Sequence, residues 1–283
     1  MKTDDPRSEY VVRNDLKLHH LDWGNEARRS IVLVHGSRLH AHVWNHFSRR
    51  FRDRYHIIAV DQRGHGDSAW GPPKDYQIEE LYRDLRAVIE SRGLSRYTLI
   101  GHSLGGRVSM LYASRHQTEL ERLVLVDITP GRPATPAEPG ARPAGTSPLR
   151  DFESEAAAIA YLARAMRRAP PHLVDESVRH GMRRNDAGRY VWKYDPVLFS
   201  HRVSLPEGMN LWNLVATVAT PTLLQYGSHS DVVNADLAAR LQATMPNCKV
   251  ERIEDAGHGL FTDQPDAFAA SVAEFIESAS ATS

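Results

Sequence analysis

One stretch predicts how this chain folds: Leu99-Ile100-Gly101-His102-Ser103-Leu104-Gly105-Gly106. Residues 97–100 form a short apolar, β-branched run that is typical of a buried strand, and residues 104–116 place apolar side chains at helical spacing. We therefore expect a strand to turn sharply into a helix at Ser103. Glycines two positions before and two positions after the serine let the strand and the helix approach closely, a turn known as a nucleophile elbow.

Such a turn would expose the Ser103 hydroxyl. The first N–H groups of the following helix, and the positive end of its dipole, would lie where negative charge develops on an attacked carbonyl oxygen. A Gly-x-Ser-x-Gly pattern alone also occurs in tight structural turns. The strand before it and the amphipathic helix after it favour a nucleophilic serine here.

The composition is ordinary for a soluble globular protein. Of the 283 residues, 41% are apolar and 25% are charged, which fits one main domain with an inserted part. Basic and acidic residues both number 35, so no global field attracts nucleic acid or an anionic membrane surface. We expect a small-molecule substrate, no nucleic-acid or membrane partner, and a monomer or homodimer.

The first residues of the chain and the lack of a long apolar stretch predict a cytoplasmic protein. The first residues, Met1-Lys2-Thr3-Asp4-Asp5-Pro6, lack the apolar core of a signal peptide. No uninterrupted apolar stretch is long enough to span a bilayer. The single cysteine, Cys248, excludes an internal disulfide and any cysteine-based zinc site.

The first 129 residues alternate between strand and helix patterns. An edge hairpin is expected first, followed by buried strands that alternate with amphipathic helices. The expected strands are 9–12, 16–23, 31–34, 55–60, 97–100 and 122–127, and the expected helices are 43–51, 78–91 and 104–116. This alternation predicts an α/β fold with a doubly wound, mostly parallel sheet and helices on both of its faces.

Two of the loops that follow these strands have sequences that indicate a role. His35-Gly36-Ser37 follows the third strand, where acyl-transfer enzymes of this layout place one oxyanion donor. The predicted oxyanion hole therefore consists of the N–H groups of Ser37 and Leu104. The other loop, residues 61–68, has neither a phosphate-binding nor a dinucleotide-binding pattern, so we interpret it as a structural crossover held by its charged residues.

The composition changes at Thr129. Residues 130–148 are rich in proline and glycine and predict a flexible link, and helical patterns follow at 151–168 and 170–184. An aromatic loop is expected at 190–196. We interpret residues 130–215 as a mainly helical cap inserted after the sixth strand, with residues 1–129 and 216–283 forming the core domain.

Three residues supply the order Ser, acid, His that this type of elbow requires: Ser103, Asp231 and His258. Each lies in a loop just after an expected strand, at 97–100, 221–226 and 248–253, so all three should meet at one edge of the sheet, where open α/β sheets bind ligands. His258 would be the base, and Asp231 would fix its tautomer. Asp127 is the rival for the acid, since it also ends a strand after the nucleophile.

The substrate pocket is expected to lie beneath the cap. Residues expected to line it are His35, Arg38, His42, Trp44, His102, Asp127 and Trp192. His42 and His46 have the i,i+4 spacing of metal ligands on a helix, but no His-Glu-x-x-His pattern occurs and no carboxylate lies among them. We therefore predict no metal site.

Taken together, these motifs resemble the α/β-hydrolase fold superfamily. The resemblance rests on His35-Gly36, the loop 61–68, the elbow 101–106, Gly227-x-x-x-Asp231 and Gly257-His258. It covers about residues 10–130 and 216–278 and is nearest to small capped carboxylesterases, lactonases and cofactor-free haloperoxidase-like proteins. It implies an eight-stranded sheet, hydrolysis through an acyl-enzyme, and no cofactor.

Within that superfamily, Ser103 argues against epoxide hydrolases and haloalkane dehalogenases, which use aspartate at the elbow. Carbon–carbon bond hydrolases carry a glycine- and proline-bearing segment that Ser37-Arg38-Leu39-His40 does not match. The leading hypothesis is hydrolysis of a small carboxylic ester or lactone. The alternatives are cleavage of an amide or carbon–carbon bond, and a ligand sensor on the same fold.

Overall fold

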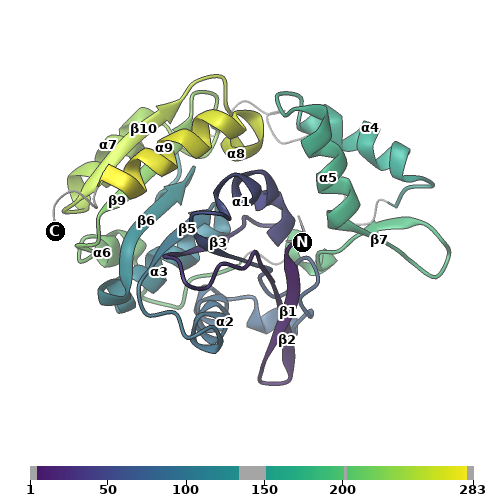
Figure 1. Ribbon diagram of the computed structural model, residues 1–283, viewed down its shortest axis with the longest axis horizontal. Helices are drawn as coiled ribbons and strands as arrows, with labels where there is room; N and C mark the ends of the chain where they lie inside the picture. The colour runs from purple at the N-terminus through teal and green to yellow at the C-terminus, as the bar shows by residue number, and fades with distance from the viewer. Residues whose placement is uncertain (1–4, 134–150, 201–202, 279–283) are drawn as a thin grey trace.

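The computed structural model describes residues 5–133, 151–200 and 203–278, and its centre is one large sheet (Figure 1). Eight strands lie in the order β1-β2-β4-β3-β5-β6-β9-β10. Their bounds are β1 (Arg7–Arg13), β2 (Leu16–Asp22), β3 (Ser30–Val34), β4 (His56–Val60), β5 (Tyr97–His102), β6 (Leu120–Val126), β9 (Thr222–Gly227) and β10 (Cys248–Ile253). From β4 to β10 every pair is parallel, which confirms the eight-stranded, mostly parallel sheet.

The antiparallel part of the sheet is the hairpin at its edge. Asn14 and Asp15, which join β1 to β2, have φ angles of 49° and 61°. Asparagine and aspartate tolerate this left-handed conformation, which a tight two-residue turn requires. β2 then pairs antiparallel with β4, so that β1 is the end strand of the sheet.

Helices cover both faces of the sheet, as predicted. Side chains alternate along each strand, so Val32 and Val34 of β3 pack into one core while Ile31 and Leu33 pack into the other. The first core is closed by α2 (Ile78–Ser91), α3 (Leu104–His116) and α7 (Ala235–Thr244), and the second by η1 (Ala41–Trp44), α1 (Asn45–Phe51), α8 (Leu260–Asp263) and α9 (Pro265–Ser278). Short turns η2 (Pro73–Asp75) and η3 (Gln117–Glu119) complete this part.

The segment between β6 and β9 forms an insertion beside the sheet (Figure 1). It contains α4 (Glu155–Ala165), α5 (Pro171–Gly181), β7 (Met182–Arg184), β8 (Tyr190–Trp192), η4 (Pro196–Phe199) and α6 (Leu211–Val215). β7 pairs with β8, so part of the predicted aromatic loop is a short strand. α6 packs into the core of α2 and α3. Most of the predicted proline-rich link, residues 130–148, lies outside the described residues, which leave out 134–150.

The insertion contacts the sheet domain through α5. Glu176 accepts a hydrogen bond from Asn45 at 2.8 Å and pairs with Arg49 of α1. The ring of His180 stacks on His42 with centroids 3.7 Å apart. These contacts place α5 against η1 and α1, directly after the loop that follows β3. Among the described helices, none is both long and apolar enough to cross a membrane.

Candidate active site

Three side chains form a hydrogen-bonded chain at the carboxyl edge of the sheet. His258 Nε2 lies 3.0 Å from Ser103 Oγ, and His258 Nδ1 lies 2.7 Å from Asp127 Oδ2. Ser103 follows β5, Asp127 follows β6 and His258 follows β10. Ser103 and His258 are partly exposed, whereas Asp127 is completely buried. A reactant can therefore reach the serine and the imidazole but not the carboxylate.

The carboxylate that pairs with His258 in the structure is Asp127 and not the predicted Asp231. Asp231 lies in the loop after β9, and its side chain is exposed. Asp127 instead leaves β6, which is the neighbour of the nucleophile strand β5, and its backbone turns at φ 50° as the strand ends. This turn directs the carboxylate to His258. Both loops reach the same edge, so the direction of the side chains decides between the two aspartates.

The end of β9 and the loop after it donate hydrogen bonds to the Asp127 carboxylate. Asp127 Oδ1 accepts the Gly227 N–H at 3.0 Å, and Oδ2 accepts the Ser230 hydroxyl at 2.6 Å as well as His258. The Ser230 oxygen in turn accepts the N–H groups of Val232 and Val233, each at 3.0 Å. The sequence analysis did not identify Ser230. The one sequence feature that could have pointed to it is its position directly before Asp231, in the loop after β9.

The elbow holds Ser103 in a conformation that serine rarely adopts, with φ 51° and ψ −113° at the N-cap of α3. A side chain at Gly101 would lie 2.6 Å from the carbonyl oxygen of Gly105, and one at Gly105 would lie 2.6 Å from that of His35. Only glycine permits such a close approach of β5, α3 and the loop after β3. The surrounding structure therefore fixes the strained serine.

The loop after β3 lies against the nucleophile, as the predicted oxyanion hole requires. A Cβ at Gly36 would be 3.1 Å from the Cβ of Ser103 and 2.5 Å from Nδ1 of the His102 ring. Ser37 is the next residue, and Leu104 is the first residue of α3. Their N–H groups thus belong to the two segments that flank Ser103. Their role as oxyanion donors stays a prediction.

The ring of His102 packs against the imidazole of His258. Its Nε2 is 3.0 Å from the carbonyl oxygen of His258, and the two rings are 4.6 Å apart. Burial lowers the pKa of His102 well below its usual range, so the ring is neutral and Nε2–H donates to this carbonyl. His102 therefore supports the loop that carries the base.

The structure divides the other residues expected in the pocket into two groups. His35 and Trp44 are buried in the core: His35 Nε2 accepts the Gln62 N–H, and Trp44 packs on Phe261. The second group lies where the insertion meets the sheet domain. In this group the Arg38 guanidinium lies 4.7 Å above the Phe199 ring, His42 stacks on His180, and Trp192 stacks on Tyr194.

Two aspartates of the loop 61–68 and a histidine of β2 form a group of residues with metal-ligand chemistry. Ligand atoms of His19, Asp61 and Asp67 lie within 4.8 Å of one another. Protein donors already engage them: Asp61 accepts the N–H groups of Ala41 at 2.6 Å and Asp67 at 3.0 Å, and Lys193 pairs with the Asp67 carboxylate. The group therefore ties the loop together, in agreement with its interpretation as a structural crossover.

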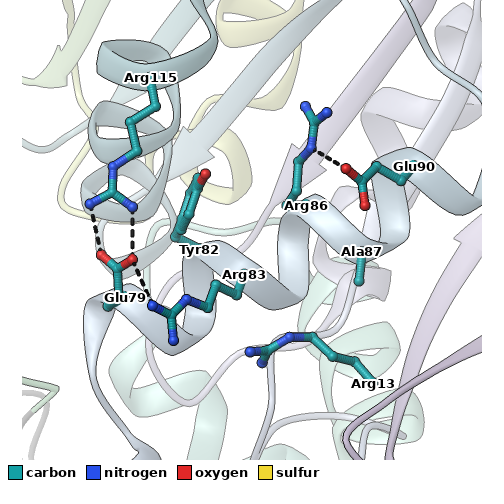
Figure 2. Close-up of a pocket in the computed structure, with 8 residues that line it drawn as sticks. All are labelled: Arg13, Glu79, Tyr82, Arg83, Arg86, Ala87, Glu90 and Arg115. Atoms are coloured by element: carbon teal, nitrogen blue, oxygen red, sulfur yellow. Dashed lines mark hydrogen bonds and ion pairs between the residues drawn. The ribbon is translucent and has the colours of Figure 1, made fainter.

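A hollow of about 510 Å³ lies along α2, with Arg115 of α3 on one side and Arg13 of β1 on the other (Figure 2). It is lined by Arg13, Glu79, Tyr82, Arg83, Arg86, Ala87, Glu90 and Arg115. Arginines and glutamates pair across it, such as Arg115 with Glu79 at 2.8 Å. Arg115 lies in the last turn of α3 and Ser103 precedes its first turn, roughly 18 Å apart at the helical rise. This hollow is therefore separate from the Ser103 site.

Comparison with known proteins agrees with this geometry. Residues 31–271 match the alpha/beta hydrolase family. The esterase Rv0045c of Mycobacterium tuberculosis is 30% identical over 252 residues, which cover 87% of this chain and 82% of that protein. N-formylmaleamate deformylase of Pseudomonas putida is 26% identical over 270 residues, which cover 94% of this chain and 95% of that protein.

A solved structure extends the likeness in fold. The crystal structure of E-2-(acetamidomethylene)succinate hydrolase superimposes with a TM-score of 0.85 over 96% of this chain and 99% of that chain, at 24% identity. The esterase and the deformylase named above are hydrolases, which supports a hydrolase here. Because the family match extends over most of its length, the chain belongs to the alpha/beta hydrolase family.

Proposed function

We propose that the protein hydrolyses a small carboxylic ester or lactone through an acyl-enzyme formed on Ser103. The observation that carries this proposal is the unbroken chain from Ser103 Oγ to His258 at 3.0 Å and from His258 to Asp127 at 2.7 Å. A serine hydroxyl is a weak nucleophile by itself, and a base at this distance activates it. The esterase among the relatives supports the ester class.

The reaction proceeds in two halves. Ser103 Oγ attacks the carbonyl carbon while His258 Nε2 takes its proton, and the imidazolium then protonates the departing alkoxide. Water next attacks the acyl-enzyme and gives a proton to His258 Nε2; the bond from the acyl carbon to Ser103 Oγ then breaks, Oγ takes that proton back, and the free acid leaves. The buried Asp127 carboxylate holds the Nδ1–H tautomer of His258 and stabilises the imidazolium in both halves.

The oxyanion of each tetrahedral intermediate is stabilised by the N–H groups of Ser37 and Leu104. Both segments lie beside Ser103, and the N-terminus of α3 adds its positive dipole end. We further propose that residues 130–215 act as a cap that selects the substrate. Support comes from α5, which contacts η1 and α1 beside the loop after β3.

Amide hydrolysis is the second candidate. N-formylmaleamate deformylase matches nearly the whole chain, and its name states removal of a formyl group from an amide-type nitrogen. The same serine, base and acid can cleave an amide when His258 protonates the departing nitrogen. The two functions therefore differ in the leaving group and not in the nucleophile.

The test is a matched panel of activated esters, lactones and amides that share the same acyl groups, with mass spectrometry of the trapped acyl-enzyme. We expect many turnovers on esters or lactones and an adduct on Ser103. A higher kcat/KM for the matched amides would favour the second candidate. No turnover and no Ser103 adduct would overturn both, and stoichiometric release would indicate a ligand sensor.

A further inference from the structure

The edge hairpin carries a second Ser-His-Asp hydrogen-bonded chain. Ser8 Oγ lies 2.7 Å from His19 Nε2, and His19 Nδ1 lies 2.7 Å from Asp61 Oδ2. The atoms are connected in the same order as in the Ser103 chain, and the serine-to-imidazole distance is shorter. Ser8 is exposed, whereas His19 and Asp61 are each only 1% exposed. An exposed hydroxyl is thus backed by a buried imidazole and carboxylate.

The hydrogen bonds define which nitrogen of His19 can act as a base. Asp61 also accepts the N–H groups of Ala41 and Asp67, so its carboxylate is held as an acceptor. Burial acts to raise the pKa of Asp61, but the hydrogen bond from His19 and the nearby histidines outweigh it and hold that pKa well below its usual range. An ionised carboxylate takes the Nδ1–H of His19 and leaves the Nε2 lone pair for the Ser8 hydroxyl.

We propose that Ser8 is a second nucleophilic serine, a site that accepts an acyl group from activated esters. In this step Ser8 Oγ forms a bond to the carbonyl carbon and gives its proton to His19 Nε2. The bond from that carbon to the leaving oxygen then breaks, and the leaving group takes the proton from the imidazolium. The products are O-acyl-Ser8 and a free phenol or alcohol.

The neighbours of Ser8 indicate the class of acyl donor. Tyr10 lies directly opposite His19 in the strand register, and Ser8 and Val12 lie on the same face of β1 as Tyr10. The Tyr10 ring, 43% exposed, is 5.0 Å from the His19 ring, and Val12 is 68% exposed. This open aromatic and aliphatic strip fits aryl esters and other activated esters of small apolar acids.

Deacylation at Ser8 is expected to be slow. Ser8 lies inside a strand, whereas Ser103 caps α3, whose dipole and N–H groups can stabilise an oxyanion. Without that stabilisation both tetrahedral intermediates form slowly, but the phenolate of an activated ester is a good leaving group, whereas O-acyl-serine is an ordinary alkyl ester, so deacylation is the slower step. The site should therefore accumulate one covalent group instead of turning over.

The experiment uses the full chain with Ser103→Ala, which removes the first nucleophile. The protein is treated with p-nitrophenyl acetate and, in parallel, with a fluorophosphonate, and the modified residues are located by peptide mass spectrometry. Ser91 is an internal control, because it is exposed and its hydroxyl donates to the carbonyl of Val88, not to an imidazole. We expect Ser8 to be modified at least on the order of 10²-fold faster than Ser91, the usual contribution of a general base.

Two further variants in the Ser103→Ala background isolate the mechanism. His19→Asn keeps an N–H donor for Asp61 but removes the base, and should lower Ser8 modification by about 10²-fold. Ser8→Ala should abolish the adduct. Equal rates at Ser8 and Ser91, or an unchanged rate in folded His19→Asn, would overturn the proposal. The Ser8-to-Ser91 ratio decides the matter even if His19→Asn fails to fold.

Discussion

Unlike the Ser30-His56-Asp22 chain, in which the serine contacts Nδ1, the hydrogen-bonded chains at Ser103 and Ser8 place the serine at the histidine Nε2, and these two chains differ in their surroundings more than in their distances. In both, the imidazole Nδ1 is 2.7 Å from a carboxylate, and Nε2 lies 3.0 Å from Ser103 or 2.7 Å from Ser8. Ser103, however, is strained at φ 51° between a buried strand and a helix N-terminus, whereas Ser8 lies in an exposed edge strand.

This difference shows why the three side chains alone do not make a catalyst. A base and an acid activate the hydroxyl, but turnover also needs donors for the oxyanion in both half reactions. The sheet edge brings the loop after β3 and the start of α3 to Ser103. At Ser8 the neighbouring side chains come from the hairpin, such as Tyr10 and Lys17, whose ammonium group lies 3.8 Å from the centroid of the Tyr10 ring. We therefore propose catalysis at Ser103 and stoichiometric acylation at Ser8.

The largest expected effect comes from Ser103→Ala. Ester turnover should fall by about 10⁴-fold or more, as when the nucleophile of a serine hydrolase is removed. Stability should change little, because the elbow depends on its glycines. The measurement is kcat on one ester together with the melting temperature, and Ser8→Ala is the matched control with unchanged turnover. Equal losses of kcat in Ser103→Ala and Ser8→Ala would contradict the proposal that only Ser103 supports turnover.

Asp127→Asn should have the next largest effect. An asparagine cannot hold the Nδ1–H tautomer of His258, and kcat should fall by about 10⁴-fold, as in the corresponding change in a serine protease. Asp231→Asn is the control, since that side chain is exposed and should matter little. Circular dichroism checks that both variants fold. A larger loss in Asp231→Asn would return the role of the acid to Asp231.

Ser230→Ala sharpens the comparison, because it removes a donor that supports Asp127. A hydrogen bond to a charged group contributes about 1.5–3 kcal/mol, so we expect kcat to fall by about tenfold or more. Ser230→Thr should restore activity. Ser228→Ala is a control on the same loop, because the Ser228 hydroxyl is buried and has no hydrogen-bond partner within the described part of the chain. Similar losses in Ser228→Ala and Ser230→Ala would point to the loop and not to the hydroxyl.

The smallest expected effect is a loss of stability at acid pH, caused by the buried histidines at the contact between α5 and η1. Burial lowers the pKa of His42 from 6.5 to about 4, and burial also lowers the pKa of His180. Between these pH values the unfolded chain binds more protons than the folded one, so stability falls as the pH drops from about 6.5 to about 4. The melting temperature should follow this trend. His42→Phe keeps an aromatic ring but removes the titrating group, so the melting temperature should depend less on pH. An identical pH dependence in His42→Phe and the parent protein would show that His42 does not cause it.

The sequence by itself determined the sheet and the turn at Ser103, and it placed His258 among the candidate site residues. Continuous apolar runs predict strands buried on both faces, and β3, β4 and β5 are buried along their whole length. The glycines around Ser103 encode the turn locally, because only glycine allows the approach of β5 and α3. The short pair β7 and β8 was missed, since three residues per strand give too weak a pattern.

Only the tertiary structure decided which carboxylate pairs with each imidazole. Asp127 and Asp231 both follow strands that end at the same edge, and their sequence environments do not reveal which side chain is buried toward His258. His19 and Asp61 are 42 residues apart and belong to no common motif. Local patterns encode the backbone, whereas the partner of a side chain depends on the direction and burial that packing imposes.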